Sequence, residues 1–95
     1  MKSYHVYILK CSDGSFYTGS TSSLEQRLAE HETGTFPKNY TANRRPVRLV
    51  WTQGFAHPRD MVSAERQLKG WTHAKKQALI EGDIGALKDL AKKRF

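Results

Sequence analysis

The chain has 95 residues, which suits a single domain spanning residues 1–95. Its composition, 38% hydrophobic and 26% charged residues, is that of an ordinary globular protein and excludes a fibrous or disordered class. The formal net charge of +7 favours a polyanionic partner, of which nucleic acid is the commonest. Simple solubility is the alternative explanation of the charge.

The single cysteine, Cys11, excludes an internal disulfide and fits a reducing cytosol. The N-terminus lacks the apolar run of a signal peptide, and no stretch is long enough to span a membrane. We therefore expect a soluble cytoplasmic protein without a membrane partner.

The first two predicted elements are strands joined by a tight turn. Tyr4–Lys10 is rich in β-branched, aromatic and aliphatic residues, and Ser15–Gly19 returns after the turn signal Asp13-Gly14. Tyr7 and Tyr17 each lie on one of these strands. The two tyrosines can share chemistry only if they point to the same face of the hairpin.

Two registers of this hairpin are open. A two-residue loop pairs Lys10 with Tyr17 and sends Tyr7 and Tyr17 to opposite faces. A three-residue loop with Gly14 in the left-handed conformation places Tyr17 opposite Leu9 and diagonal to Tyr7 on one face. A shared site requires the second register.

A helix is predicted from a cap at Ser22 or Ser23 to a C-terminal Gly34. Each serine is followed three residues later by Glu or Gln, which predicts a capping box. On the helical wheel, Arg27 and His31 fall on or beside the apolar stripe. Both side chains are therefore expected to face inward.

The rest of the chain predicts a loop, one more strand and further helices. The loop contains two prolines, the strand is rich in β-branched and aromatic residues, and the helices begin at Pro58 and at a Thr72 cap. A last short helix is expected to turn Leu87 and Leu90 inward. The predicted segments are Thr35–Pro46 (loop), Val47–Phe55 (strand), Pro58–Lys69 (helix) and Thr72–Ile80 (helix).

Glu65 is an unusual residue for its position, because it lies on the apolar stripe of the second predicted helix, about 40° from Met61. A carboxylate in such a place must be paired or must bind a metal ion. A salt bridge to Arg27 is one solution and a divalent cation is the other. Mg²⁺ needs only one or two protein carboxylates when water and phosphate complete its shell.

Taken singly, these residues have ordinary explanations. Tyrosines on strands commonly pack, Arg27 could be a solvated cation, and His31 could be a buried structural imidazole. Together they supply what phosphodiester cleavage needs: groups that orient and deprotonate water, a guanidinium for the phosphoryl oxygens, and a carboxylate for a metal ion.

The triplets His5-Val6-Tyr7 and Tyr17-Thr18-Gly19, with Arg27, His31 and Glu65 after them, resemble the GIY-YIG nuclease family. The resemblance covers roughly residues 4–80 and is strongest to small stand-alone bacterial members. It implies that Tyr7, Tyr17, Arg27 and His31 are catalytic and that Glu65 binds Mg²⁺ or Mn²⁺. Either tyrosine is a candidate general base.

The loop before the third strand carries an aromatic side chain among cations, which suits the stacking of an unpaired base. A solvated loop is the alternative. The candidate nucleic-acid-binding residues are Lys38, Tyr40, Arg44, Arg45 and Arg48.

The sequence thus predicts an α/β (α+β) domain with a three-stranded, mainly antiparallel sheet flanked by helices. Its predicted function is divalent-metal-dependent endonuclease cleavage of DNA, with single strands favoured over duplex. The main alternative is a non-catalytic nucleic-acid-binding module of the same fold. A protein-interaction domain with a basic surface is a third.

Overall fold

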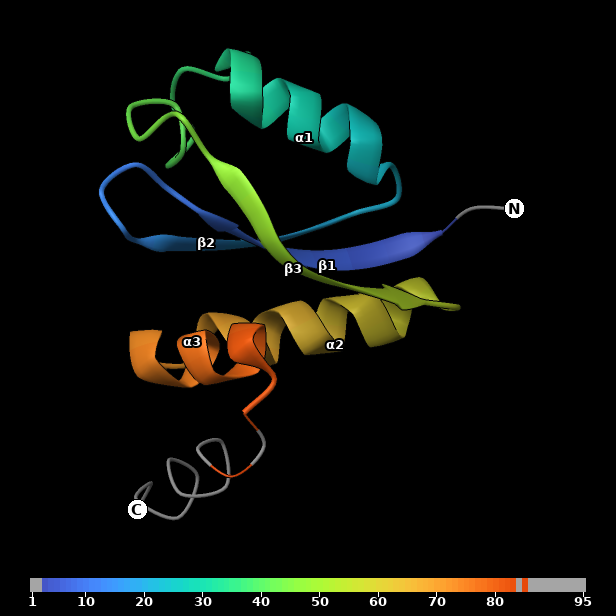
Figure 1. Ribbon diagram of the computed structural model, residues 1–95. Coiled ribbons are helices and arrows are strands. Elements are labelled where there is room, and N and C mark those ends of the chain that lie inside the picture. The colour runs from blue at the N-terminus through green and yellow to red at the C-terminus, as the bar shows by residue number, and fades with distance from the viewer. Residues whose placement is uncertain (1–2, 84, 86–95) are drawn as a thin grey trace.

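The computed structural model describes residues 3–83 and 85, and it has the predicted α+β architecture (Figure 1). Within these residues a three-stranded sheet is combined with three helices. The predicted helix with Leu87 and Leu90 lies outside the described residues. The elements in chain order are β1 (Tyr4–Lys10), β2 (Phe16–Thr21), α1 (Leu24–Thr33), β3 (Arg48–Phe55), α2 (Pro58–Lys69) and α3 (His73–Glu81).

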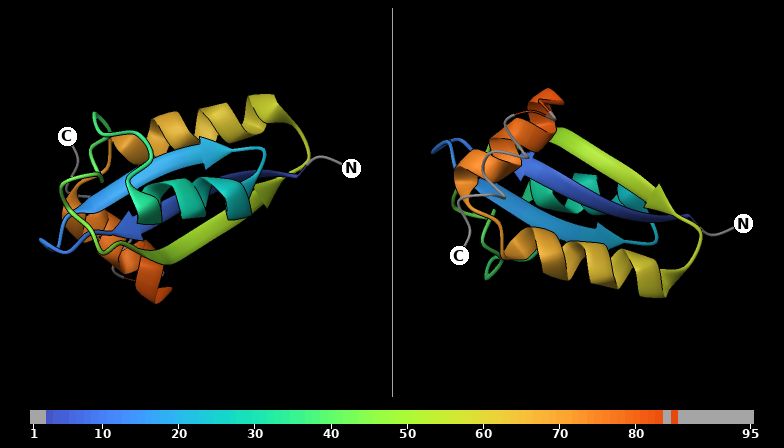
Figure 2. Two further views of the ribbon diagram at one scale, coloured as in Figure 1. Left: turned by 90° about the horizontal axis from the view of Figure 1, so that it is seen from above. Right: turned by 90° about the horizontal axis from the view of Figure 1, so that it is seen from below.

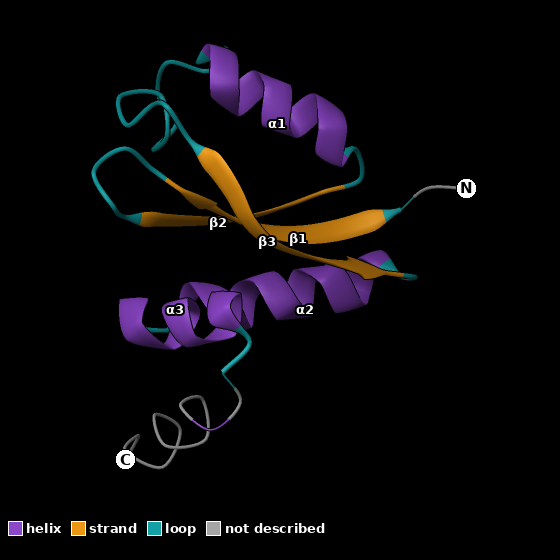
Figure 3. Ribbon diagram, in the orientation of Figure 1, coloured by secondary structure: helices purple, strands orange, loops and turns teal. Residues whose placement is uncertain are grey.

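The sheet has the order β2-β1-β3, and both strand pairs are antiparallel. The sheet separates α1 on one face from α2 and α3 on the other (Figure 3). Viewed from above and from below, α2 runs along the β2 side of the sheet (Figure 2). The central strand is the most buried element, because Val6, Tyr7, Ile8 and Leu9 are each at most 1% exposed.

The hairpin between β1 and β2 has the three-residue loop. Leu9 pairs with Tyr17, and Gly14 has a φ of 84°. The Cys11 N–H donates to the Ser15 carbonyl over 2.9 Å and closes the turn. The two-residue alternative is therefore wrong, and Tyr7 and Tyr17 share the face that α1 covers.

The helix ends follow the predicted glycine signals, but the predicted capping box is absent. Gly34 and Gly82 end α1 and α3 in the left-handed conformation, at φ 68° and 71°. Ser23 occupies the N-cap position of α1 without a side-chain hydrogen bond. Its own N–H donates to Thr21 Oγ1 over 3.0 Å, so the group that the glutamine of a capping box would bind is already used.

Several boundaries differ from the prediction by one or two residues. β2 begins at Phe16 rather than Ser15, and α3 ends at Glu81 rather than Ile80. β2 extends to Thr21, two residues beyond the predicted Gly19, and β3 begins at Arg48 rather than Val47. The longer β2 places Ser20 in the sheet opposite Val6. This extension brings Ser20 to α2.

In the part of the chain that the structure describes, no helix has the length and apolarity that crossing a membrane requires.

Candidate active site

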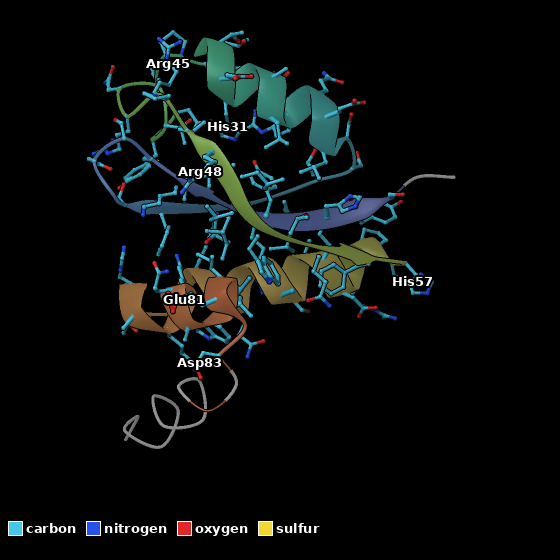
Figure 4. All side chains as sticks on the ribbon, viewed as in Figure 1. His31, Arg45, Arg48, His57, Glu81 and Asp83 are labelled. Atoms are coloured by element: carbon cyan, nitrogen blue, oxygen red, sulfur yellow. The ribbon has the colours of Figure 1, made fainter. Side chains whose placement is uncertain are left out.

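A buried chain of polar side chains links β1, α1 and the loop before β3. Tyr7 Oη lies 2.9 Å from His31 Nε2, and His31 Nδ1 lies 2.7 Å from Thr41 Oγ1. All three residues are at most 2% exposed. Figure 4 shows His31 pointing from α1 toward the sheet, as the helical wheel predicts. The imidazole therefore holds Tyr7 in one orientation.

His31 is a neutral imidazole at physiological pH in this setting. Burial lowers its pKa, and the positive charge of Arg27 lowers it further. A neutral imidazole donates from one nitrogen and accepts at the other. The two hydrogen bonds that link Tyr7, His31 and Thr41 therefore run in one direction: one hydroxyl donates to His31, and the other accepts from it.

Tyr7 is a poor base in the free protein. Burial, followed by the proximity of Tyr17, raises the pKa of its hydroxyl from 10 to about 12. The Arg27 side chain opposes this shift but does not cancel it. Of the two tyrosines predicted as bases, the less buried Tyr17 is therefore the better candidate, and Tyr7 is a positioned hydroxyl.

The aromatic rings of the site form one cluster. Tyr17 lies 6.4 Å from Tyr7, 5.1 Å from His31 and 6.1 Å from Tyr40, measured between ring centroids. Gly19 makes room for this cluster. A Cβ atom at Gly19 would lie only 2.5 Å from the Tyr7 Oη, so the glycine of the second triplet is required by close packing.

Arg27 borders the same cluster. Its Nη1 donates to Glu30 Oε1 over 3.1 Å, and its guanidinium lies 5.3 Å from the Phe36 ring centroid. Burial lowers the Arg27 pKa, but the hydrogen bond with Glu30 and the proximity of Tyr7 outweigh burial and leave the pKa raised. The guanidinium is thus permanently charged and partly held in place.

Glu65 approaches the site from the opposite side of the sheet. Ser20 Oγ donates to Glu65 Oε1 over 2.7 Å, and Lys69 Nζ pairs with Oε2 at 2.9 Å. Burial raises the Glu65 pKa, but these two partners reverse the shift, so the carboxyl is ionised at neutral pH. The Glu65 charge also raises the pKa of Tyr7, but it is the smallest of the contributions to that shift.

The predicted alternative for Glu65, an ion pair with Arg27, is wrong. Arg27 pairs within its own helix with Glu30, and Glu65 pairs with Lys69, one turn along α2. The sheet separates the two helices, so each charge finds its partner locally.

The residues around Glu65 fit a divalent cation held by one carboxylate. Among residues 3–83 and 85, no group of three ligating side chains is gathered. Mg²⁺ tolerates such a site, because water and substrate phosphate fill the other positions. Lys69 now occupies Oε2, but its side chain is 56% exposed and can move away. Oε2 of the ionised Glu65 would then be available to a cation.

The predicted nucleic-acid-binding residues divide into two groups. Arg44 donates to Asp13 Oδ2 over 3.1 Å and covers one face of the Tyr40 ring at 3.8 Å. Arg45 donates to the Ala42 and Glu32 carbonyls and lies beside the C-terminal end of α1 (Figure 4). These two arginines stabilise the loop.

The other two cations are free of such contacts. Lys38 and Arg48 are exposed, and within residues 3–83 and 85 neither pairs with an acidic side chain.

Two residues of the site have no signature in the sequence. Thr41 lies in a loop ten residues beyond His31, and Ser20 meets Glu65 across 45 residues. Neither spacing is periodic.

The comparison with known proteins resolves the identity of the fold. Residues 3–78 match the family described as the GIY-YIG catalytic domain. The chain belongs to the GIY-YIG family. The resemblance expected from the tyrosine triplets is thereby confirmed, and membership of this family points to nuclease chemistry on nucleic acid.

Relatives of similar size support this membership. The chain is 45% identical over 80 residues to a UPF0213 protein of Lacticaseibacillus paracasei, covering 84% of this chain and 89% of the relative. It is 41% identical over 77 residues to a UPF0213 protein of Halobacterium salinarum, covering 81% and 99%. The GIY-YIG domain therefore accounts for most of the length of these relatives too.

Two solved structures have the same fold. The solution structure of a UPF0213 protein from Bacillus halodurans matches with a TM-score of 0.57 at 34% identity, covering 97% of this chain and 96% of that one. That of a protein from E. faecalis matches with a TM-score of 0.61 at 38% identity, covering 86% of each chain.

Proposed function

We propose that this protein is a divalent-metal-dependent endonuclease that hydrolyses DNA phosphodiester bonds. The observation that carries the proposal is the convergence of Tyr7, Tyr17 and His31 on one sheet face, with Arg27 beside them. The ionised Glu65 lies next to β2, where Ser20 holds it. Packing alone would not need a charged guanidinium beside a buried tyrosine.

In this proposal each side chain has one role. The Arg27 guanidinium grips two phosphoryl oxygens and stabilises the charge of the pentavalent transition state. Tyr17 orients the attacking water and is the candidate to relay its proton, since the Tyr17 hydroxyl can accept that proton while it releases its own to solvent. Tyr7, fixed by His31 and Thr41, donates a hydrogen bond at the reacting phosphate.

Glu65 is the proposed ligand for Mg²⁺ or Mn²⁺. A cation bound there would neutralise phosphate charge and assist the leaving oxygen. Members of this family are generally metal-dependent, and the lowered pKa of Glu65 keeps the ligand ionised without the cation. When the cation binds, the Lys69 ammonium would leave Glu65 and contact solvent or the substrate.

The proposed substrate groove runs along the exposed cations Lys38 and Arg48 and the Tyr40 ring. Arg44 and Arg45 shape it by ordering the loop. We propose a preference for single-stranded DNA, because the described residues offer an aromatic ring and exposed cations that suit an unpaired strand.

The test is Glu65→Gln, with Glu25→Gln as a control that removes one exposed carboxylate from α1. Cleavage of single-stranded, duplex and branched oligonucleotides is measured with Mg²⁺ and with Mn²⁺. Glu65→Gln should abolish cleavage while DNA binding stays near wild type, because lysines and arginines supply most of the affinity. Glu25→Gln should cleave normally.

Two outcomes would contradict the proposal. Normal cleavage by a folded Glu65→Gln protein would remove the metal assignment. DNA binding by the wild type without product on any substrate would favour the non-catalytic binding module.

A further inference from the structure

A small pocket lies at the outer edge of β2, next to Tyr17. It has a volume of about 210 Å³ and is lined by Phe16, Tyr17, Thr18, Tyr40, Lys69 and Lys76. Within residues 3–83 and 85, β2 is an edge strand with no neighbouring strand on this side. The pocket therefore opens beside the proposed base, and Lys69 connects it to Glu65.

The aromatic walls of the pocket are supported from behind. Phe16 stacks on His73, with ring centroids 4.3 Å apart and an angle of 12° between the rings. Tyr17 and Tyr40 are nearly parallel, at 20°. His73 Nε2 is 3.2 Å from the Gly14 carbonyl, which ties α3 to the hairpin. These rings are pre-positioned and present flat surfaces at low entropic cost.

The polar wall consists of two lysines from different helices. Lys69 comes from the end of α2 and Lys76 from α3. Burial lowers the pKa of Lys76, and the charge of Lys69 lowers it further, so the two ammonium groups repel each other. Within residues 3–83 and 85, Lys76 has no acidic partner. A half-buried, unpaired cation is costly unless an anion binds to it.

We propose that this pocket binds one unpaired nucleotide of the substrate strand, next to the bond that is cut. The base lies against Phe16 and Tyr17, and its phosphate lies between Lys69 and Lys76. The volume is below the range of about 300–1,000 Å³ that larger organic ligands need, so it suits a single base. This inference rests on the proposed nuclease function and deepens it.

A consequence for substrate choice follows from the geometry. A base inside a duplex has both faces stacked on its neighbours and cannot offer a face to Tyr17. The nucleotide in the pocket must therefore be single-stranded or displaced from its pair. The pocket gives a physical basis for single-strand preference that does not require the loop arginines to contact the substrate themselves.

Lys76→Gln tests the pocket, and Lys75→Gln is its matched control. Lys75 is the preceding residue on α3, lies over the Trp71 ring at 4.4 Å and does not line the pocket. Both variants lose one charge. Their affinities for fluorescein-labelled (dT)6 and for a blunt hairpin duplex are measured by anisotropy in EDTA, and circular dichroism checks folding.

Lys76→Gln should weaken (dT)6 binding by about tenfold, whereas Lys75→Gln should weaken it by less than about threefold. Duplex binding should change equally in the two variants. Equal losses for (dT)6 would overturn the pocket assignment, since only the general charge would then matter.

A second measurement uses the wild-type protein, so it does not depend on how a variant folds. Titration with dTMP, followed by amide chemical shifts, should perturb Phe16, Tyr17 and Lys76 most. Perturbations spread evenly over the basic surface would overturn the proposal. Neither measurement needs a metal ion or cleavage. If the protein cuts DNA but fails both measurements, only the pocket proposal is refuted. If it passes both measurements but never cuts DNA, only the proposed nuclease activity is refuted.

Discussion

Gly19 provides the sharpest test of the site geometry, through the substitution Gly19→Ala. The added Cβ would lie 2.5 Å from Tyr7 Oη, 2.6 Å from Tyr7 Cζ and 3.1 Å from Tyr17 Cε2. Favourable contacts between carbon atoms lie at about 3.5–4.0 Å. Tyr7 is 1% exposed and held by His31, so its ring cannot move aside freely.

The expected loss of stability is about 1–3 kcal/mol, the range found when a well-packed core is overfilled. Gly54→Ala is the matched control, because Gly54 is also a strand glycine and the nearest side-chain atom to its added Cβ, His5 Nε2, is 3.5 Å away. It should be neutral or stabilise by about 0.4–1 kcal/mol, since alanine restricts the unfolded chain.

Urea unfolding followed by circular dichroism measures both free energies of unfolding, and thermal unfolding gives a second estimate. In a domain of this size each kcal/mol corresponds to about 4–8 °C in Tm. Gly19→Ala should also cut DNA more slowly at temperatures where it is folded, because Tyr7 is displaced. Equal stabilities of the Gly19 and Gly54 variants would refute the close packing of Tyr7 on β2.

Two further predictions concern the charged and ionisable groups. Arg27→Lys should reduce cleavage more than tenfold in single-turnover assays, because lysine keeps the charge but loses the planar fork of the guanidinium. The control Arg59→Lys, on the exposed surface of α2, should leave cleavage unchanged. Equal cleavage rates in the two variants would make Arg27 a structural cation. The raised pKa of Tyr7 means that the folded state holds this proton more tightly than the unfolded state, so wild-type stability should fall between pH 10 and about 12, by about 3 kcal/mol. Tyr7→Phe should lack this fall in urea unfolding measured across that range, and a parallel fall in both proteins would contradict the assignment.

The local signals of the sequence predicted the elements well, because they depend on residues close in the chain. Gly14 and Gly34 adopt the left-handed conformation that turns and helix ends require. Pro58 begins α2, and Thr72 caps α3 through the Lys75 N–H. Steric limits on glycine and proline act within a few residues, so no knowledge of packing is needed to use them.

The hairpin register is an intermediate case. The sequence allowed two loops and gave a reason to prefer one, namely that Tyr7 and Tyr17 must share a face. The hydrogen bond between Cys11 and Ser15 settled the choice. Local propensity left both registers open, because a two-residue and a three-residue loop can each use Asp13-Gly14.

Tertiary structure alone decided how the site residues are paired. Thr41 reaches His31 from a loop, and Ser20 reaches Glu65 from another layer of the domain. Arg44 pairs with Asp13, 31 residues away. Such contacts depend on how the layers pack and not on any periodicity. The sequence by itself therefore determined which groups are available for chemistry, and the packed sheet decided which of them meet.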